Sequence, residues 1–170
     1  MKKSAGLLMY RRSGGGSAQV LLAHPGGPFW RGKDEGAWTV PKGEYEAPEE
    51  PLAAARREFT EETGFDVTPP FVPLGEAVQK SGKRVTAWAF AGDCDPAQLR
   101  CNTFEIEWPP RSGRRQTYPE IDRIEWFDLE EARRKIIPAQ RVLIDRLEAA
   151  LQEPARQRNG PALGLQGGGG

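Results

Sequence analysis

The sequence predicts a single α/β domain, and three observations support this fold class. The chain has 170 residues, a length that suits one domain with a buried core. Short apolar runs between Gly- and Pro-rich turns predict strands, and longer periodic stretches predict helices. Hydrophobic residues make up 38% of the chain and charged residues 28%, which is typical of a soluble globular protein. We expect the domain to span residues 1–152 and a disordered, Gly- and Pro-rich tail to span residues 153–170.

The N-terminal part predicts a hairpin, a long loop and a short strand. Residues 4–11 and 19–23 are apolar runs joined by a glycine-rich turn, so they should pair as strands. The loop at residues 24–36 is rich in glycine, proline and aromatic residues, and long loops of this kind are often functional. A short strand is expected at residues 38–42, where the chain reaches a proline and a glycine.

The middle of the chain predicts a helix followed by two strands. Residues 49–63 carry the strongest helical pattern. Prolines occur only near its first turn, where a missing N–H costs little, and Gly64 follows as a C-cap. Residues 71–78 and 84–91 are then expected to form strands, separated by a Lys-Ser-Gly-Lys turn.

The C-terminal part predicts two strands, a basic loop and two helices. The strands are expected at residues 105–108 and 124–128, with a basic, proline-bearing loop at residues 109–120 between them. Helices are expected at residues 129–136 and 138–151. The second has its apolar residues at the spacing of one buried helix face.

Composition excludes several classes of protein. The formal net charge is zero, with 24 basic and 24 acidic residues, which argues against binding of polymeric nucleic acid through its phosphates. A single histidine and two cysteines without metal-like spacing exclude a Cys/His zinc site. The apolar run near the N-terminus has about six residues, too few for a secretory signal or a membrane span. We therefore expect a cytoplasmic protein with reduced thiols that makes no membrane contact.

The most informative stretch is GEYEAPEEPLAAARREFTEETGF at residues 43–65. On a helix, Glu58, Glu61 and Glu62 fall within an arc of about 100°, so three carboxylates share one face. Glutamate-rich faces are usually just solvated, but these like charges would repel one another less with a cation bound between them. Oxygen ligands indicate Mg²⁺, with Mn²⁺ as an alternative, and Mg²⁺ is commonly shared with substrate phosphates. The expected partner is therefore a small phosphorylated substrate, most simply a nucleotide.

The same stretch resembles the Nudix box, Gly-x5-Glu-x7-Arg-Glu-U-x-Glu-Glu-x-Gly-U with U apolar, and every specified position matches. Such a match should arise by chance less than about 10⁻⁹ of the time. The order of elements over residues 4–150 is also similar to that of the Nudix domain. This resemblance implies an α/β/α sandwich with a mixed central β-sheet. It also implies a divalent-metal hydrolase that cleaves a nucleoside diphosphate linked to another group.

The resemblance implies a role for each residue of the motif. The groups expected to hold Mg²⁺ are the carboxylates of Glu58, Glu61 and Glu62 and the carbonyl of Gly43. Arg57 would pair with Glu49 and orient the helix and its carboxylates. Gly64 would end the helix, and Phe65 would seal it against the sheet.

A carboxylate must also take the proton of the attacking water, and members of the family differ in which one does so. Within the motif, Glu58 is the first choice, with Glu61 as its catalytic neighbour. Outside the motif, Glu120 is the best candidate for base and further metal ligand, because it precedes a strand much as the extra ligand does in relatives. Glu105 and Glu107 are weaker alternatives.

The substrate is less constrained by the sequence. The run W-x-x-P-K-G at residues 38–43 resembles that of dinucleoside polyphosphate and diphosphoinositol polyphosphate hydrolases, and Lys42 would then reach a phosphate rather than be an ordinary surface lysine. Two basic clusters could bind further phosphates or be surface charge: Arg111, Arg114 and Arg115, and Lys80, Lys83 and Arg84. The aromatic residues expected to stack a base are Trp30, Trp38 and Tyr118.

We expect dinucleoside polyphosphates such as diadenosine tetraphosphate to be the favoured substrates. A house-cleaning pyrophosphatase of nucleoside triphosphates, including oxidised ones, is the second enzymatic hypothesis. A non-catalytic Nudix domain that senses nucleotides is the third, and the complete set of motif carboxylates argues against it. The sequence gives no information on the oligomeric state.

Overall fold

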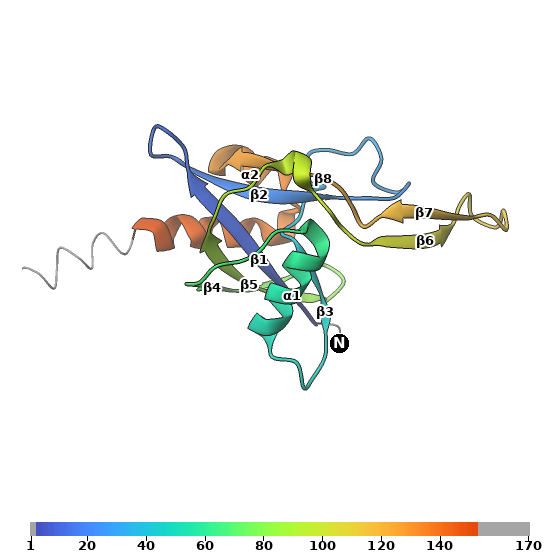
Figure 1. Cartoon of the computed structure of the whole chain (residues 1–170), viewed down its shortest axis with the longest axis horizontal. Helices are drawn as coiled ribbons and strands as arrows, with labels where there is room; N and C mark the ends of the chain where they lie inside the picture. The colour runs from blue at the N-terminus through green and yellow to red at the C-terminus, as the bar shows by residue number, and fades with distance from the viewer. Residues whose placement is uncertain (1–2, 153–170) are drawn as a thin grey trace, which may run out of the picture.

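The computed structural model describes residues 3–152, so the tail predicted at residues 153–170 lies outside the described part of the chain. The centre of the fold is a six-stranded sheet in the order β4–β5–β1–β2–β8, with β3 also paired to β1 (Figure 1). Its strands are β1 (Lys3–Arg12), β2 (Ala18–Pro25), β3 (Lys42–Tyr45), β4 (Val72–Val78), β5 (Arg84–Ala91) and β8 (Ile121–Asp128). The β1–β5 pair is parallel and the other pairs are antiparallel, which confirms the mixed sheet.

The sheet is covered on both faces, because successive residues of a strand point to opposite sides. Leu7 of β1 belongs to the apolar cluster that includes helix α1 (Pro51–Thr63). Leu8, the next residue, belongs to the opposite cluster with α2 (Leu129–Lys135) and the helix at residues 141–152. The two helical layers on either side of the sheet confirm the α/β/α sandwich (Figure 1).

Helix α1 begins and ends largely as its sequence predicts. The N-cap residue Glu50 has extended backbone angles, so the helix starts at Pro51 rather than at residue 49. It ends at Gly64, which adopts the left-handed conformation with φ of 82°. The buried face consists of Ala54, Ala55, Phe59 and Thr63. Leu52, on the same helix, is only half-buried.

The strand predicted at residues 38–42 is wrong. Trp38 and Thr39 form only isolated bridges, to Ile136 and Ala23, and strand β3 begins after Pro41. Proline has no N–H to donate to a sheet, which agrees with a strand that starts beyond it. The predicted C-terminal helix likewise starts as a 3-10 turn, η2 (Pro138–Gln140), before the helix at residues 141–152. A further turn, η1 (Pro96–Gln98), was not predicted.

A two-stranded sheet projects from the body of the domain (Figure 1). It consists of β6 (Thr103–Glu107) and β7 (Arg115–Pro119), and we call this hairpin the arm. The prediction of a basic, proline-bearing loop at residues 109–120 is wrong for its second half, which contains β7. The sequence RQTYP is polar and largely exposed, so it carries no apolar alternation from which a strand could be predicted.

Among the described residues, no helix is both long enough and apolar enough to cross a membrane. The two cysteines, Cys94 and Cys101, are half-buried free thiols. Burial is the main cause that raises the pKa of Cys94 to about 11, so its thiol stays protonated at neutral pH.

Candidate active site

Helix α1 is tied to the start of β3 through a carboxylate. The backbone N–H of Lys42 donates a hydrogen bond of 2.8 Å to Glu62 Oε1. Phe59, fully buried on the same helix, packs edge-to-face on Phe90 of the sheet with ring centroids 5.3 Å apart. The acidic face of α1 is therefore fixed relative to the residues that lead into β3.

Arg57 joins four carboxylate oxygens of the motif. Its Nε and Nη2 each donate to Glu49 at 2.8 Å, the bidentate pairing expected from the sequence. Its Nη1 donates to Glu58 at 2.7 Å and to Glu61 at 3.2 Å. The hydrogen bonds to Glu49 are the main cause that raises the pKa of Arg57. The guanidinium thus holds the acidic face in one arrangement.

Gly43 lies directly beneath the carboxylate of Glu58. A Cβ placed on Gly43 would stand 1.9 Å from the Glu58 carboxyl carbon, so any side chain here would displace that carboxylate. The side chain of Glu58 is only 15% exposed, and burial raises its pKa while Arg57 lowers it. The glycine of the motif is therefore needed for space, and it leaves its backbone close to Glu58.

Glu120 reaches the motif from the other end of the sequence. It directly precedes β8, and its backbone N–H donates to the Asn102 carbonyl at the base of the arm at 2.9 Å. Burial is the main cause that raises the pKa of Glu62 to about 8, and the charges of Glu58 and Glu120 add to this effect. Three carboxylates are thus close enough to disfavour one another's ionisation.

These residues have the chemistry of a divalent-cation site, although the described side chains do not converge on one point. In residues 3–152 no three acidic, His or Cys side chains are close enough together to surround an ion. Arg57 holds Glu58 and Glu61, and the Lys42 N–H holds Glu62. The all-oxygen donor set nevertheless fits a hard divalent cation, which would relieve the mutual repulsion.

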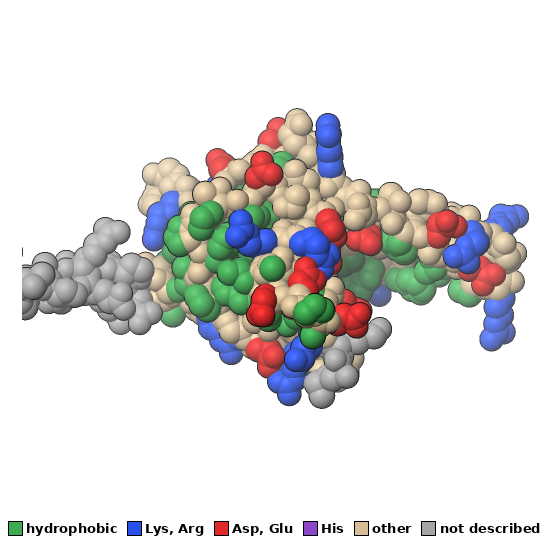
Figure 2. All heavy atoms as spheres, turned by 60° about the horizontal axis from the view of Figure 1, so that its bottom comes forward, with side chains coloured by type: hydrophobic (Ala, Val, Ile, Leu, Met, Phe, Trp, Pro, Cys, Tyr) green, Lys and Arg blue, Asp and Glu red, His purple; other side chains and the backbone are tan. Residues whose placement is uncertain are grey.

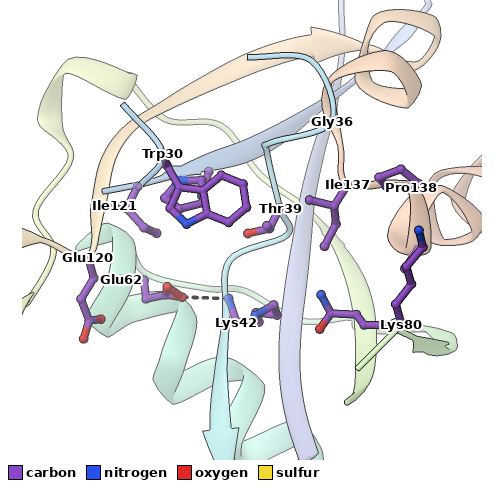
Figure 3. Close-up of a pocket in the computed structure, with 14 residues that line it drawn as sticks. Trp30, Gly36, Thr39, Lys42, Glu62, Lys80, Glu120, Ile121, Ile137 and Pro138 are labelled. Atoms are coloured by element: carbon purple, nitrogen blue, oxygen red, sulfur yellow. Dashed lines mark hydrogen bonds between the residues drawn. The ribbon is translucent and has the colours of Figure 1, made fainter. Parts of the chain in front are cut away.

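A cavity of about 570 Å³ opens beside these carboxylates (Figure 3). Trp30 lies on one side of it, and Lys42 and Glu62 lie on the opposite side, with Glu120 at the edge. Another part of the wall comes from the β4–β5 turn and from the segment that follows α2, and it includes Gln79, Lys80, Ile137 and Pro138. This volume and mixed lining are typical of a small-molecule site.

Lys42 is the basic residue best placed for a phosphate. It lines the cavity, and burial lowers the pKa of its ammonium group. Within the described part of the chain its ammonium makes no ion pair, whereas Lys83 pairs with Glu44 at 3.2 Å. Lys80 also lines the cavity, so the second basic cluster predicted from the sequence contributes one member.

Of the other residues predicted to bind the substrate, the structure places some at the cavity and others away from it. Trp30 lines the cavity, but Trp38 is 0% exposed and donates its indole N–H to Asp34 at 2.9 Å. The prediction that Trp38 stacks a base is therefore wrong, because its ring is part of the core. The residues carried away from the cavity on the arm are Arg111, Arg114, Arg115, Tyr118, Glu105 and Glu107.

The sequence analysis did not predict an aromatic contact that joins the loop to the arm. Phe29 and Trp108 pack edge-to-face with ring centroids 5.1 Å apart, joining the loop before Trp30 to the outer end of β6. The contact joins residues 79 positions apart, and a single sequence carries no signal for it. The sequence analysis also missed Gln79 and Ile137 of the cavity wall, because each lies just beyond the end of a strand or helix.

A NUDIX domain family model matches residues 2–147. That match covers most of the chain, so the chain belongs to the NUDIX family. It is a hydrolase that acts on phosphoanhydride bonds, and members of this family generally use divalent cations.

Known relatives agree with this family. The chain is 28% identical over 134 residues to a protein of Rhizobium meliloti (strain 1021) named RNA pyrophosphohydrolase, covering 70% of this chain and 75% of that protein. It is 25% identical over 161 residues to a protein of the same name from Agrobacterium fabrum, covering 79% and 89%.

Among solved structures, the fold is similar to that of a binary complex of a C. elegans Ap4A hydrolase. The TM-score is 0.62, with 22% identity and coverage of 90% of this chain and 99% of the other. The NUDIX domain of Shewanella oneidensis NrtR complexed with ADP ribose gives a TM-score of 0.59 at 14% identity, covering 88% and 87%. At these identities the likeness concerns the fold alone.

Proposed function

We propose that the chain is a Mg²⁺-dependent pyrophosphohydrolase that favours dinucleoside polyphosphates such as diadenosine tetraphosphate. One observation carries this proposal: carboxylates and a lysine that makes no ion pair among residues 3–152 line the same cavity as an aromatic ring. Glu62 and Glu120 supply negative oxygens, Lys42 a cation and Trp30 an indole. A polyphosphate held by Lys42 would present its phosphorus beside the carboxylates, and a nucleobase could stack on Trp30.

The residues of the chain would divide the work of hydrolysis among them. Glu58, Glu61 and Glu62 would hold Mg²⁺, assisted by Glu120 and the Gly43 carbonyl, and the bound ion would neutralise phosphate charge and acidify water. Glu58 or Glu120 would take the proton from the water that attacks phosphorus. Arg57 would act as a positioning residue, because its hydrogen bonds fix where the Glu58 and Glu61 carboxylates point.

The choice of substrate has two supports of different kinds. The run of residues 38–43 resembles that of dinucleoside polyphosphate hydrolases, and Lys42 of this run lies in the cavity. The C. elegans protein with a similar fold is named an Ap4A hydrolase. Both supports concern the polyphosphate end of the ligand, so the remainder of the substrate has to be identified by assay.

A second candidate is hydrolysis at the 5′ end of RNA. It is favoured by the names of the sequence relatives, both called RNA pyrophosphohydrolase. A panel of diadenosine polyphosphates, a 5′-triphosphorylated oligoribonucleotide, canonical nucleotides and 8-oxo-dGTP would separate the candidates. Turnover of 8-oxo-dGTP or of the RNA far above that of every dinucleotide would reject the favoured substrate.

The metal site is tested by Glu61→Gln, which removes one charge and keeps the shape of the side chain. We expect kcat in Mg²⁺ to fall by about 100-fold or more, with an unchanged circular dichroism spectrum. Glu50→Gln is the matched control, because Glu50 is exposed and its side chain makes no capping hydrogen bond on the same helix. Wild-type activity in Glu61→Gln would reject the assignment of the carboxylates.

A further inference from the structure

We propose that the arm and the loop at residues 26–30 form a second binding surface, outside the cavity, for the distal nucleoside of a dinucleoside polyphosphate. This inference rests on the proposed function. We call the surface the aromatic ledge, and it consists of Phe29, Phe104, Trp108 and Tyr118.

The arm has one aromatic face and one charged face. Along β6, Phe104, Ile106 and Trp108 are half-buried, and the residues between them are exposed. Phe104 lies opposite Tyr118 in the hairpin register, and their ring centroids are 6.1 Å apart. The other face carries the ion pair between Glu105 and Arg115. A two-stranded hairpin has no core of its own, so its aromatic face needs another surface to cover it.

The loop at residues 26–30 covers part of that face. The Gly26 N–H donates to the Glu120 carbonyl at 2.9 Å. One residue on, a Cβ at Gly27 would stand 2.8 Å from the Phe104 ring, so the backbone itself lies against the aromatic face. Phe29 then meets Trp108 near the outer end of β6. The loop thus follows the arm from its base outward.

The ledge is continuous with the cavity. The same two segments supply cavity wall, because Trp30 directly follows Phe29 and Glu120 directly follows β7. Figure 2 shows hydrophobic side chains along the lower side of the projecting arm, next to a hollow in the body. A ligand that leaves the cavity past Glu120 would therefore meet aromatic side chains first.

The side chain of Phe29 is exposed enough to contact a ligand. Its side chain is 57% exposed, and in residues 3–152 only Val78 among the other large hydrophobic residues is comparably exposed. Its contact with Trp108 is edge-to-face, at 73° between the planes, which leaves ring surface open for stacking. Ligand contact explains an exposed phenylalanine beside a cavity better than a contribution to folding does.

Size favours a nucleoside as the occupant, and charge favours an anionic ligand that carries it. Arg111 and Arg114 at the end of the arm are exposed and make no side-chain ion pair in the described part of the chain, so the arm attracts an anionic ligand (Figure 2). The cavity of about 570 Å³ suits one nucleotide with its phosphates, and a dinucleoside polyphosphate then has a second base outside it. Stacking on aromatic side chains binds a base whatever its identity.

Two substrates that differ only in the distal nucleoside test this inference: diadenosine tetraphosphate and adenosine 5′-tetraphosphate. We expect Phe29→Ala and Trp108→Ala each to raise KM for the dinucleotide by about 10-fold, with kcat nearly unchanged. KM for adenosine 5′-tetraphosphate should change by less than about twofold. Trp108→Phe should restore most of the affinity. Thr117→Ala is the control, because Thr117 lies opposite Glu105 on the charged face of the arm.

Four results would overturn the inference. An equal rise of KM for both substrates would mean that the ledge only supports Trp30. Unchanged kinetics in Phe29→Ala and Trp108→Ala would mean that the ledge does not bind the ligand. Weakened turnover of a 5′-triphosphorylated oligoribonucleotide, without an effect on the dinucleotide, would make a polynucleotide the occupant. A wild-type dimer in analytical ultracentrifugation that Trp108→Ala dissociates would make a second copy of the chain the occupant.

The proposed function can fail independently of this surface. If the wild-type chain hydrolyses neither tetraphosphate, the proposed function is rejected. Calorimetric binding of the same two ligands to the full chain then tests the ledge alone. We expect the wild type to bind the dinucleotide about 10-fold more tightly than the mononucleotide and Phe29→Ala to lose that preference. An equal affinity of the wild type for the two ligands would reject the surface.

Discussion

The acidic helix α1 lies at the cavity and the aromatic arm projects outside it, and the two are held in different ways. Helix α1 is anchored by a fully buried Phe59 and by the hydrogen bond between Glu62 and the Lys42 backbone. The arm has no buried residue in either strand and contacts the body mainly at its base and through the loop beside it. The carboxylates are thus carried by an anchored helix, whereas the outer surface has fewer contacts and can adjust to a ligand.

The largest expected difference between the two regions concerns stability. Phe59→Ala removes a fully buried ring from the contact between α1 and the sheet, and we expect a loss of about 3–5 kcal/mol. Ile106→Ala on the half-buried face of the arm should cost less than about 1 kcal/mol, because much of its side chain already meets water. Urea unfolding of both variants measures the two values. Equal losses would contradict the comparison.

The second expected effect is a loss of activity without a matching loss of stability. In Gly43→Ala the new methyl group displaces the Glu58 carboxylate, which can move because it ends a flexible side chain. We expect kcat to fall by about 100-fold, or about 2.7 kcal/mol, while the melting temperature changes little. The matched control is Gly15→Ala, where nothing lies within 4 Å of the new Cβ. A Gly43→Ala enzyme with wild-type kcat would show that the Glu58 position is not critical.

The sequence predicted α1 and its surroundings better than the arm, for physical reasons. A continuous apolar run marked β1, and the glycine after Thr63 marked the end of α1, because burial and backbone conformation restrict the residues allowed there. Glu120 was singled out through the family resemblance, by its place before a predicted strand, and its role stays a prediction. The strand β7 was missed because its exposed residues satisfy no burial constraint. Trp38 was misassigned because a tryptophan can fill either a core or a cavity wall, and composition does not distinguish them.

A substitution that loosens the loop carrying Trp30, between α1 and the arm, should have an effect of intermediate size on stability and KM. His24, only 2% exposed, has Nδ1 2.9 Å from Asp122 Oδ1 and Nε2 2.6 Å from the Lys33 carbonyl, so it fastens the far end of the loop that carries Trp30. We expect His24→Ala to cost about 1–3 kcal/mol of stability and to raise KM more than it lowers kcat. Steady-state kinetics and urea unfolding give both numbers. A loss of kcat with unchanged KM would place the loop in the catalytic step instead.

The smallest effect is expected at Asp34, which fastens the same loop by accepting hydrogen bonds from Lys135 and from the Trp38 indole. The bond with Lys135 is the main cause that lowers the pKa of Asp34 in the folded chain. A pKa below the unfolded value of about 3.9 means that this stabilisation is fully present above that pH and is lost as pH falls through the folded pKa.

Because the Asp34 side chain is 48% exposed, the contribution should stay below about 1 kcal/mol at neutral pH. Urea unfolding of the wild type and Asp34→Asn at pH 7 and pH 3 measures it, and the difference between the two proteins should shrink at pH 3. A difference that is as large at pH 3 would mean that Asp34 acts through packing rather than charge. In that case packing would hold the loop, as it holds α1. The arm alone would then be the adjustable part of the substrate site.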